Sequence, residues 1–181
     1  IKTAYSFGLT LDELRAQIRR LCTERFVPED VWVTSLMTYW WESTRDVVQV
    51  VLEELPHARI YIGGIYPSLA PWHAESRIAS LAPDRITIVQ GEIYAASELP
   101  TDMSLYDADH SFHCRVPTYA LNTGSRGCPF DCAYCAQRQL NANLRTIRHR
   151  PAKDIADEME DKYRRYAVRE FAFYEDNLLI V

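Results

Sequence analysis

The chain has 181 residues, of which 48% are hydrophobic and 25% charged, and its formal net charge is −5 at pH 7. This composition is ordinary for a globular protein with a buried core, and the negative charge argues against a surface dedicated to nucleic acid or anionic lipid. No apolar run approaches the roughly 18–20 residues of a membrane span, and residues 1–10 lack the features of a signal peptide. Three of the five cysteines crowd between positions 128 and 135, which indicates free thiols in a reducing compartment, so we expect a cytoplasmic protein.

The first half of the sequence alternates between helical and strand patterns. Thr10 and Glu13 form a capping-box sequence, in which each side chain satisfies the other's backbone N–H group at the start of a helix. Ser43 is expected to cap a second helix, whose apolar face comprises Val47, Val50, Val51 and Leu55. The expected elements are helix 11–26, strand Val31–Leu36, helix 43–55, strand Ile60–Ile62, helix Ala74–Leu81 and strand Arg85–Val89. This alternation predicts crossover units and an open parallel sheet in an α/β layer.

Residues 91–117 interrupt the alternation and are expected to connect two domains. They contain several potential metal ligands, namely Asp107, Asp109, His110, His113 and Cys114. We interpret this stretch as a polar linker, because its spacing matches no fixed ligand pattern, and Cys114 as an extra cluster ligand is the less favoured alternative. The two domains are therefore expected to span residues 1–110 and 111–181.

After this connection the alternation resumes. The expected elements are strand Thr118–Asn122, loop Gly124–Gln137, helix Lys153–Tyr166 and strand Glu170–Tyr174. Pro151 lies just ahead of the helix, where its missing N–H costs no hydrogen bond. Ile155, Met159 and Tyr163 recur every four residues, which predicts one apolar stripe on this helix.

The loop expected at 124–137 contains Cys128, Cys132 and Cys135, spaced as C-x3-C-x2-C. Three thiolates on one short loop can converge on a single small object, and thiolates suit iron–sulfur clusters or zinc. Structural zinc sites usually have four ligands, and no fourth ligand occurs at a matching distance in the sequence. Three cysteines on a four-iron cluster would instead leave one iron open to a substrate or a cofactor.

The run from Gly127 to Cys135, with the aromatic Tyr134 just before the third cysteine, resembles the CxxxCxxC signature of the radical S-adenosylmethionine (SAM) superfamily. The resemblance implies that the three cysteines ligate three irons of a 4Fe-4S cluster and that SAM chelates the fourth. It also implies that a reducing donor such as flavodoxin or ferredoxin supplies one electron, which cleaves SAM to a 5′-deoxyadenosyl radical that abstracts hydrogen from an unidentified substrate. Tyr134 is expected to contact these cofactors.

A second match to the superfamily lies at Phe171–Asn177, which is expected to form a strand and the segment after it. In β/α barrels this end of a strand carries the functional residues. Where the superfamily often has Gly-Gly-Glu in contact with the methionine end of SAM, this chain has Tyr-Glu-Asp-Asn. We expect Glu175 and Asp176 to meet the SAM ammonium group, and the alternative is a solvated acidic turn.

Charged residues flank the cysteines on both sides. Gly127 is expected to allow a tight turn, and Arg126 either offsets the negative charge of a cluster or lies on the surface. A short basic run follows, which we interpret as a solvated face rather than a phosphate site: Arg145, Arg148, His149 and Arg150.

The N-terminal layer resembles the cobalamin-binding type of Rossmann-like domain that precedes many radical SAM cores. The likeness rests on Thr34–Thr38, which includes Ser35, and on Ile62–Gly64. In that family these loops line the nucleotide tail of cobalamin, and Gly63 and Gly64 would permit its close approach. The D-x-H-x-x-G motif that supplies an axial histidine is absent, although it would lie upstream of Ile1. Because likeness of fold does not carry function, we favour a degenerate domain without cobalamin, its pocket filled by Tyr39, Trp40, Trp41 and Tyr66.

The sequence contains roughly the first two of the β/α units that a radical SAM barrel needs. We therefore expect a partial barrel in a truncated chain, or in one completed by another polypeptide, and expect it to be inactive by itself. Three functions remain open. The first is a radical SAM enzyme of unidentified substrate, the second is a cobalamin-dependent radical SAM methyltransferase, and the third is a non-catalytic interaction module that holds zinc or a cluster at the same cysteines.

Overall fold

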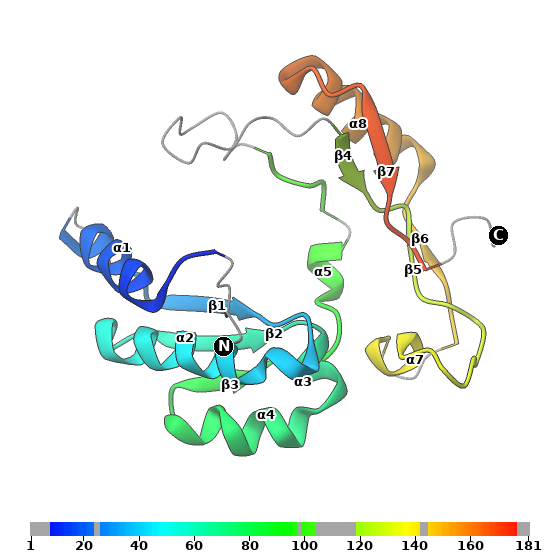
Figure 1. Cartoon of the computed structure of the whole chain (residues 1–181). Coiled ribbons are helices and arrows are strands. Elements are labelled where there is room, and N and C mark those ends of the chain that lie inside the picture. The colour runs from blue at the N-terminus through cyan, green and yellow to red at the C-terminus, as the bar shows by residue number, and fades with distance from the viewer. Residues whose placement is uncertain (1–7, 24–25, 98, 104–118, 142–144, 177–181) are drawn as a thin grey trace, which may run out of the picture. The chain divides into compact units, whose positions relative to one another are not determined.

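The computed structural model describes residues 8–23, 26–97, 99–103, 119–141 and 145–176, and the chain divides into two compact units (Figure 1). The first unit is Ile1–Gly91 and the second is Glu92–Val181. The predicted domain boundary after residue 110 and the potential ligands between Asp107 and Cys114 lie outside the described residues. Within the described ranges, no helix is both long enough and apolar enough to span a bilayer.

A parallel sheet of three strands forms the centre of the first unit. In spatial order, the strands are β1 (Asp30–Thr34), β2 (Arg59–Gly63) and β3 (Ile86–Ile88). Parallel neighbours require crossover connections. The first crossover contains α2 (Trp41–Glu54), and the second contains α3 (Ile65–Leu69), α4 (Pro71–Arg77) and the 3₁₀ turn η2 (Ala79–Leu81). The predicted open parallel α/β layer is therefore confirmed.

Helix α2 differs from its prediction in its start and in its buried face. It begins at Trp41, so Ser43 lies inside the first turn and does not cap the helix. Val50 and Val51 are buried as predicted, but the main buried stripe is Thr44, Val48, Val51 and Leu55. These positions are spaced by four, three and four residues and so align along one side of a helix, which leaves Val47 beside the stripe and only partly buried.

The hydrophobic core of the first unit lies on one face of its sheet. Ile60 and Ile62 of β2 are fully buried there with Ile78. Successive side chains of a strand point to opposite faces, so the residues between them lie on the other face. On that face Trp32 stacks against Tyr61 with the ring centroids 4.6 Å apart, and Trp32 remains 60% exposed.

Helix α1 (Leu11–Thr23) starts with the predicted capping box and packs against α2. The Glu13 N–H donates to Thr10 Oγ1 at 3.2 Å, and the Thr10 N–H donates to Glu13 Oε2 at 2.8 Å. Arg15 and Arg19 of α1 donate to Glu54 of α2 at 2.9 Å and 2.7 Å. The hydrogen bonds from Arg19 and then Arg15 lower the pKa of Glu54 to about 2.

One β–α–β crossover forms the centre of the second unit. Strands β4 (Tyr119–Asn122) and β7 (Glu170–Phe173) are parallel neighbours, and α8 (Ala152–Tyr166) lies between them in the sequence. Two very short strands, β5 (Ser125–Arg126) and β6 (Arg148–His149), pair antiparallel between β4 and α8. This order agrees with the predicted strand–loop–helix–strand succession. The strands that the structure describes close no barrel.

Several one-turn helices were not predicted. These are η1 (Thr38–Trp40), α3, α5 (Tyr94–Ser97) and α7 (Gln137–Leu140). Each is too short for an apolar repeat to become visible in the sequence. Helix α3 also contains Pro67, but this proline lies in the first turn, where helical N–H groups have no intrahelical acceptor.

Helix α8 buries charged residues in place of the predicted apolar stripe. Its buried positions are Glu158, Lys162 and Tyr166, whereas Tyr163 is 52% exposed. Lys162 Nζ donates to Glu158 Oε1 at 2.6 Å and to Asn122 Oδ1 of β4 at 2.7 Å. Arg150 Nη2 lies 2.8 Å from Glu158 Oε2. An apolar repeat could not predict this buried face, because charged side chains can be buried where ion pairs and hydrogen bonds replace their hydration.

Candidate metal centre

The cysteine loop follows β5 and begins with a turn that only glycine fits well. Gly127 has φ +97°, in the left-handed region that disfavours other residues. A Cβ on Gly127 would overlap the carbonyl oxygen of Thr146 and would lie 2.7 Å from Asn141 Nδ2. Asn141 itself donates to the same carbonyl at 3.4 Å. The expected tight turn is therefore present, and it sets the chain directly against the segment that leads into β6.

The three cysteines of the motif line one cavity. Its volume is about 370 Å³, and its walls are formed by Cys128, Phe130, Cys132, Tyr134, Cys135, Gln137 and Asp176. Cys132 and Cys135 are exposed, and Cys128 is partly buried. Among the described residues, no three His, Cys, Asp or Glu side chains gather tightly enough to enclose a single metal ion. Three soft sulfur donors on one cavity wall suit an iron–sulfur cluster or zinc.

Hydrogen bonds shape the loop around the second and third cysteines. The Cys135 N–H donates to the carbonyl of Cys132 at 3.0 Å, which closes a turn between them. The Gln137 N–H donates to Cys135 Sγ at 3.5 Å. Tyr134, between the two cysteines, is 92% exposed, and its hydrogen bond with Cys132 raises the pKa of the phenol. The aromatic ring is thus available at the rim of the cavity.

Asp131 connects the cysteine loop to residues that follow it. Arg138 Nη1 donates to Asp131 Oδ2 at 2.6 Å, and Arg145 Nη2 donates to the same oxygen. The hydrogen bond from Arg138 is the main cause that lowers the pKa of Asp131. Arg145 was expected on a solvated face with the rest of the basic run, but it is held against the loop.

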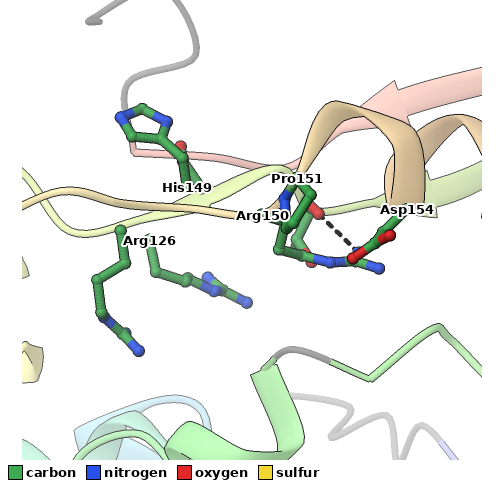
Figure 2. A pocket seen from close by; sticks show the side chains of 8 residues that line it. Arg126, His149, Arg150, Pro151 and Asp154 are labelled. Carbon is green, nitrogen blue, oxygen red and sulfur yellow. Dashed lines mark hydrogen bonds between the residues drawn. The ribbon is translucent and has the colours of Figure 1, made fainter.

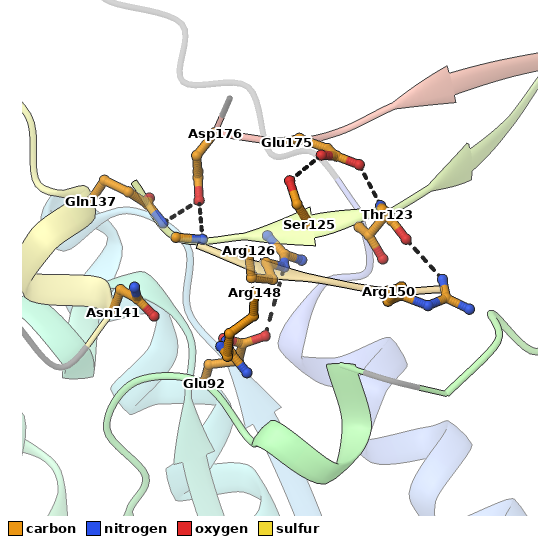
Figure 3. A network of polar contacts seen from close by, with 12 residues as sticks. Glu92, Thr123, Ser125, Arg126, Gln137, Asn141, Arg148, Arg150, Glu175 and Asp176 are labelled. Carbon is orange, nitrogen blue, oxygen red and sulfur yellow. Dashed lines mark hydrogen bonds and ion pairs between the residues drawn. The ribbon is translucent and has the colours of Figure 1, made fainter. Parts of the chain in front are cut away.

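Glu175 and Asp176 follow β7 and lie against the start of the cysteine loop (Figure 3). Glu175 accepts hydrogen bonds from the Gly124 N–H with one oxygen and from the Ser125 hydroxyl with the other. Asp176 Oδ2 accepts from the Gly127 N–H at 3.1 Å and from the Gln137 side chain. Of the two carboxylates, Asp176 lines the cysteine cavity. Both are tied by hydrogen bonds to the residues around the cysteines, although Asp176 is exposed and Glu175 only partly buried.

A second cavity, of about 320 Å³, lies beside the β5–β6 pair (Figure 2). It is lined by Thr123, Ser125, Arg126, Arg148, His149, Arg150, Pro151 and Asp154. Its arginines are matched by carboxylates. Arg148 pairs with Glu92, Arg126 Nε lies 3.8 Å from the same carboxylate, and Arg150 pairs with Glu158. The three arginines of the basic run are therefore engaged in ion pairs, and Arg145 and His149 are exposed while Arg148 and Arg150 are partly buried.

Sequence reasoning missed Glu92, Asp131 and Gln137. Each of the three forms a hydrogen bond or ion pair with a residue that is distant in the sequence. Examples are the pair of Glu92 with Arg148 and the pair of Gln137 with Asp176. No local spacing in the sequence signals such pairs. For Asp131 a weak signal existed, because it lies inside the cysteine motif next to Cys132.

The residues predicted to approach a cobalamin tail make contacts within the first unit. Ser35 is 3% exposed; its N–H donates to the Gly63 carbonyl at 2.9 Å, and its Oγ accepts from Thr44 Oγ1 at 2.8 Å. Gly64 has φ +101°, and a Cβ there would lie 2.6 Å from the Ser35 carbonyl oxygen. A Cβ on Gly63 would meet its nearest neighbour, Val89, at 3.9 Å, an ordinary contact. The close approach at Gly64 is thus to the chain's own backbone.

The four aromatic residues expected to fill that pocket separate into two groups. Tyr66 is buried and Trp41 is partly buried in the core of the first unit. Tyr39 and Trp40 lie on the surface, where they are 69% and 50% exposed. Only the first two therefore act as filling for the interior.

No family model, no curated protein and no solved structure matches this chain. The likeness to the radical SAM superfamily therefore rests on the cysteine motif and on the carboxylates that follow β7.

Proposed function

We propose that this chain is the cluster-binding part of a radical SAM enzyme. In this proposal Cys128, Cys132 and Cys135 ligate three irons of a 4Fe-4S cluster and leave the fourth iron to the amino and carboxylate groups of SAM. The observation that carries the proposal is the shared cavity of about 370 Å³, which three cysteine side chains line together with a carboxylate from the end of the neighbouring parallel strand. Three sulfur donors and one carboxylate are the groups that such a pair of cofactors needs.

Asp176 is the residue that we assign to the amino group of SAM, as the acceptor for its N–H bonds when its nitrogen binds iron. Its Oδ2 is held by the Gly127 N–H and by Gln137, so the direction of the carboxylate is fixed before any ligand arrives. A carboxylate on the wall of the cavity accepts a stronger hydrogen bond from the N–H of this amine than a neutral amide would. Glu175 has a different role, because both of its oxygens are occupied by Gly124 and Ser125, and it holds the β4–β5 turn in place.

Tyr134 and Phe130 supply apolar surface at the rim of the same cavity. Both rings are exposed, and aromatic faces pack well against a planar adenine ring. Together the two rings would orient the cofactor and exclude water from one side of the cavity. When bound, the cluster and SAM supply one-electron cleavage of the SAM carbon–sulfur bond, which yields methionine and a 5′-deoxyadenosyl radical that takes a hydrogen atom from substrate. The electron comes from a reducing donor of the flavodoxin or ferredoxin class.

Two other functions are less well supported than this one. A structural zinc site usually has four ligands, and the sequence offers no fourth ligand at a matching distance from the three cysteines. A cobalamin-dependent methyltransferase would need the loops at Ser35 and Gly64 to receive a nucleotide tail. Ser35 is buried and hydrogen-bonded within the unit, which favours a degenerate domain without cobalamin.

The test is anaerobic reconstitution of the whole chain with iron and sulfide. We expect about four irons and four labile sulfides per chain, and an electron paramagnetic resonance spectrum of the reduced cluster that changes when SAM is added. Cys132→Ala should lose the cluster absorbance. Cys22→Ala is the matched control, because Cys22 is a free, partly buried cysteine of α1 in the other unit, and it should load normally. One zinc without sulfide, or a cluster spectrum that SAM leaves unchanged, would contradict the proposal.

A further inference from the structure

The cysteine loop is held by an ion-pair bridge that the cysteines do not take part in. Asp131 lies between the first and second cysteines in the sequence. Its Oδ2 accepts a hydrogen bond from Arg138 at 2.6 Å and another from Arg145. Arg138 belongs to α7, just after the third cysteine, and Arg145 precedes β6. One carboxylate oxygen therefore joins the interior of the loop to two segments beyond it.

We infer that Asp131 is a positioning residue, which fixes the spacing of the three thiols and sets the local charge next to them. The inference rests on the proposed function, because its purpose is to hold a cluster. Asp131 is bonded directly to Cys132 in the chain, so anchoring its side chain restricts the second cysteine. Arg138 on the far side of Cys135 restricts the third. The bridge thus spans the part of the loop that carries the two exposed thiols.

Because the ion-pair bridge is exposed to solvent, we expect it to position the cysteines without adding much to the free energy of unfolding. The side chains of Arg138, Asp131 and Arg145 are 40%, 44% and 56% exposed. Ion pairs at such exposure contribute little to the free energy of unfolding, since water and salt screen them. Their effect on the cluster is different, because residues around the ligands commonly change metal affinity by about 10–100-fold.

The same carboxylate determines the charge that surrounds the thiolates. With Asp131 ionised, the two guanidinium groups that converge on it are partly neutralised. Replacing it by asparagine leaves both positive charges near the cluster without a carboxylate. Reduction adds one negative charge to the cluster, so uncompensated positive charge favours the reduced form. A role limited to folding would not shift this equilibrium.

The experiment compares Asp131→Asn and Asp131→Glu with the wild-type chain. Asp157→Asn is the control, because Asp157 is an exposed carboxylate of α8 that pairs with Lys153. For Asp131→Asn we expect iron loss to a chelator to be about tenfold faster. At a fixed applied potential we expect the ratio of reduced to oxidised cluster to rise about three- to tenfold. In the metal-free protein, amide hydrogen exchange across residues 128–136 should accelerate, while thermal unfolding stays unchanged. Asp131→Glu should recover most of the wild-type values, and Asp157→Asn should match wild type throughout.

The experiment distinguishes a failure of the proposed function from a failure of the positioning role of Asp131. If the wild-type chain takes up no iron–sulfur cluster, the proposed function fails. If it takes up the cluster and Asp131→Asn keeps the wild-type rate of iron loss and reduction ratio, the positioning role is wrong while the proposed function stands. Unchanged hydrogen exchange of the loop in the metal-free variant would also overturn the positioning role, independently of any cluster.

Discussion

Asp176 accepts a hydrogen bond from the backbone N–H of Gly127 at 3.1 Å. This contact joins the residue after β7 to the residue before the first cysteine, although the two are far apart in the sequence. The parallel pairing of β4 with β7 makes the contact possible, because it brings the ends of both strands to the same edge of the sheet. The crossover through α8 therefore builds the wall of the cysteine cavity.

We expect Asp176→Asn to weaken SAM binding to the reconstituted protein by about tenfold or more, because a hydrogen bond to a charged group contributes roughly 1.5–3 kcal/mol. Cluster loading should change little, since the amide oxygen can still accept from Gly127. Titration of SAM against the cluster spectrum measures the effect. Glu175→Gln is the comparison, and it should leave SAM affinity intact while lowering the melting temperature. Equal SAM affinities for Asp176→Asn and wild type would remove Asp176 from the cofactor site.

Gly127→Ala should destabilise the second unit by at least about 2 kcal/mol. The left-handed backbone at φ +97° already disfavours alanine, and the new methyl group would overlap the Thr146 carbonyl. Denaturant unfolding followed by circular dichroism gives the free energy. Gly63→Ala is the control glycine, because a Cβ there meets only an ordinary contact at 3.9 Å, and it should change stability by much less. A Gly127→Ala variant as stable as wild type would show that the turn can relax.

Lys162→Met should lower the free energy of unfolding by about 3 kcal/mol. The side chains of Lys162 and Glu158 are only 2% and 3% exposed, and the substitution leaves the buried carboxylate with Arg150 and the Thr101 N–H but without its ammonium partner. Burial raises the pKa of Glu158, but the hydrogen bonds from Lys162, the Thr101 N–H and Arg150 outweigh it and hold the pKa below its usual value. The double variant Lys162→Met with Glu158→Leu should recover part of the loss. A single variant within 0.5 kcal/mol of wild type, on the order of a surface substitution, would contradict this account.

The stability of the first unit should fall in acid because of Glu54. Its pKa is about 2 in the folded chain and 4.5 ordinarily, so the unfolded chain binds the proton first as the pH falls. The stabilisation from Arg15 and Arg19 is therefore complete above about pH 4.5 and is lost as the pH drops through about 2. Melting temperatures of wild type and Glu54→Gln should differ most above about pH 5 and converge only as the pH falls to about 2. A difference that stays constant with pH would exclude this linkage.

Local patterns predicted much of the fold. The capping box at Thr10 and Glu13 and the succession of β1, α2 and β2 depend on neighbours within a few residues, so they can be seen in the sequence. Three of the four residues predicted for the buried face of α2 are buried, namely Val50, Val51 and Leu55, and Thr44 was missed because a polar residue is not counted in an apolar repeat. The buried face of α8 was missed for a stronger reason: its members are charged and find their partners on β4 and at Arg150.

The candidate site was predictable only where it is contiguous. Cys128, Cys132 and Cys135 lie on one loop, and their spacing alone placed them together. The bridge from Asp131 to Arg145 and the pair of Gln137 with Asp176 depend on how separate segments meet. A glycine before the cysteines indicated a turn, but not that Thr146 would occupy the space beside it.

The segment entering β6 touches the cysteine loop at two neighbouring positions. Arg145 reaches Asp131 in the middle of the loop, and the carbonyl of Thr146 fills the space beside Gly127 at its start. Two adjacent residues thus contact both the start and the middle of the cysteine loop. A displacement of that pair would release both anchoring points of the loop together, so the geometry of the cavity that the cysteines line depends on residues outside the motif.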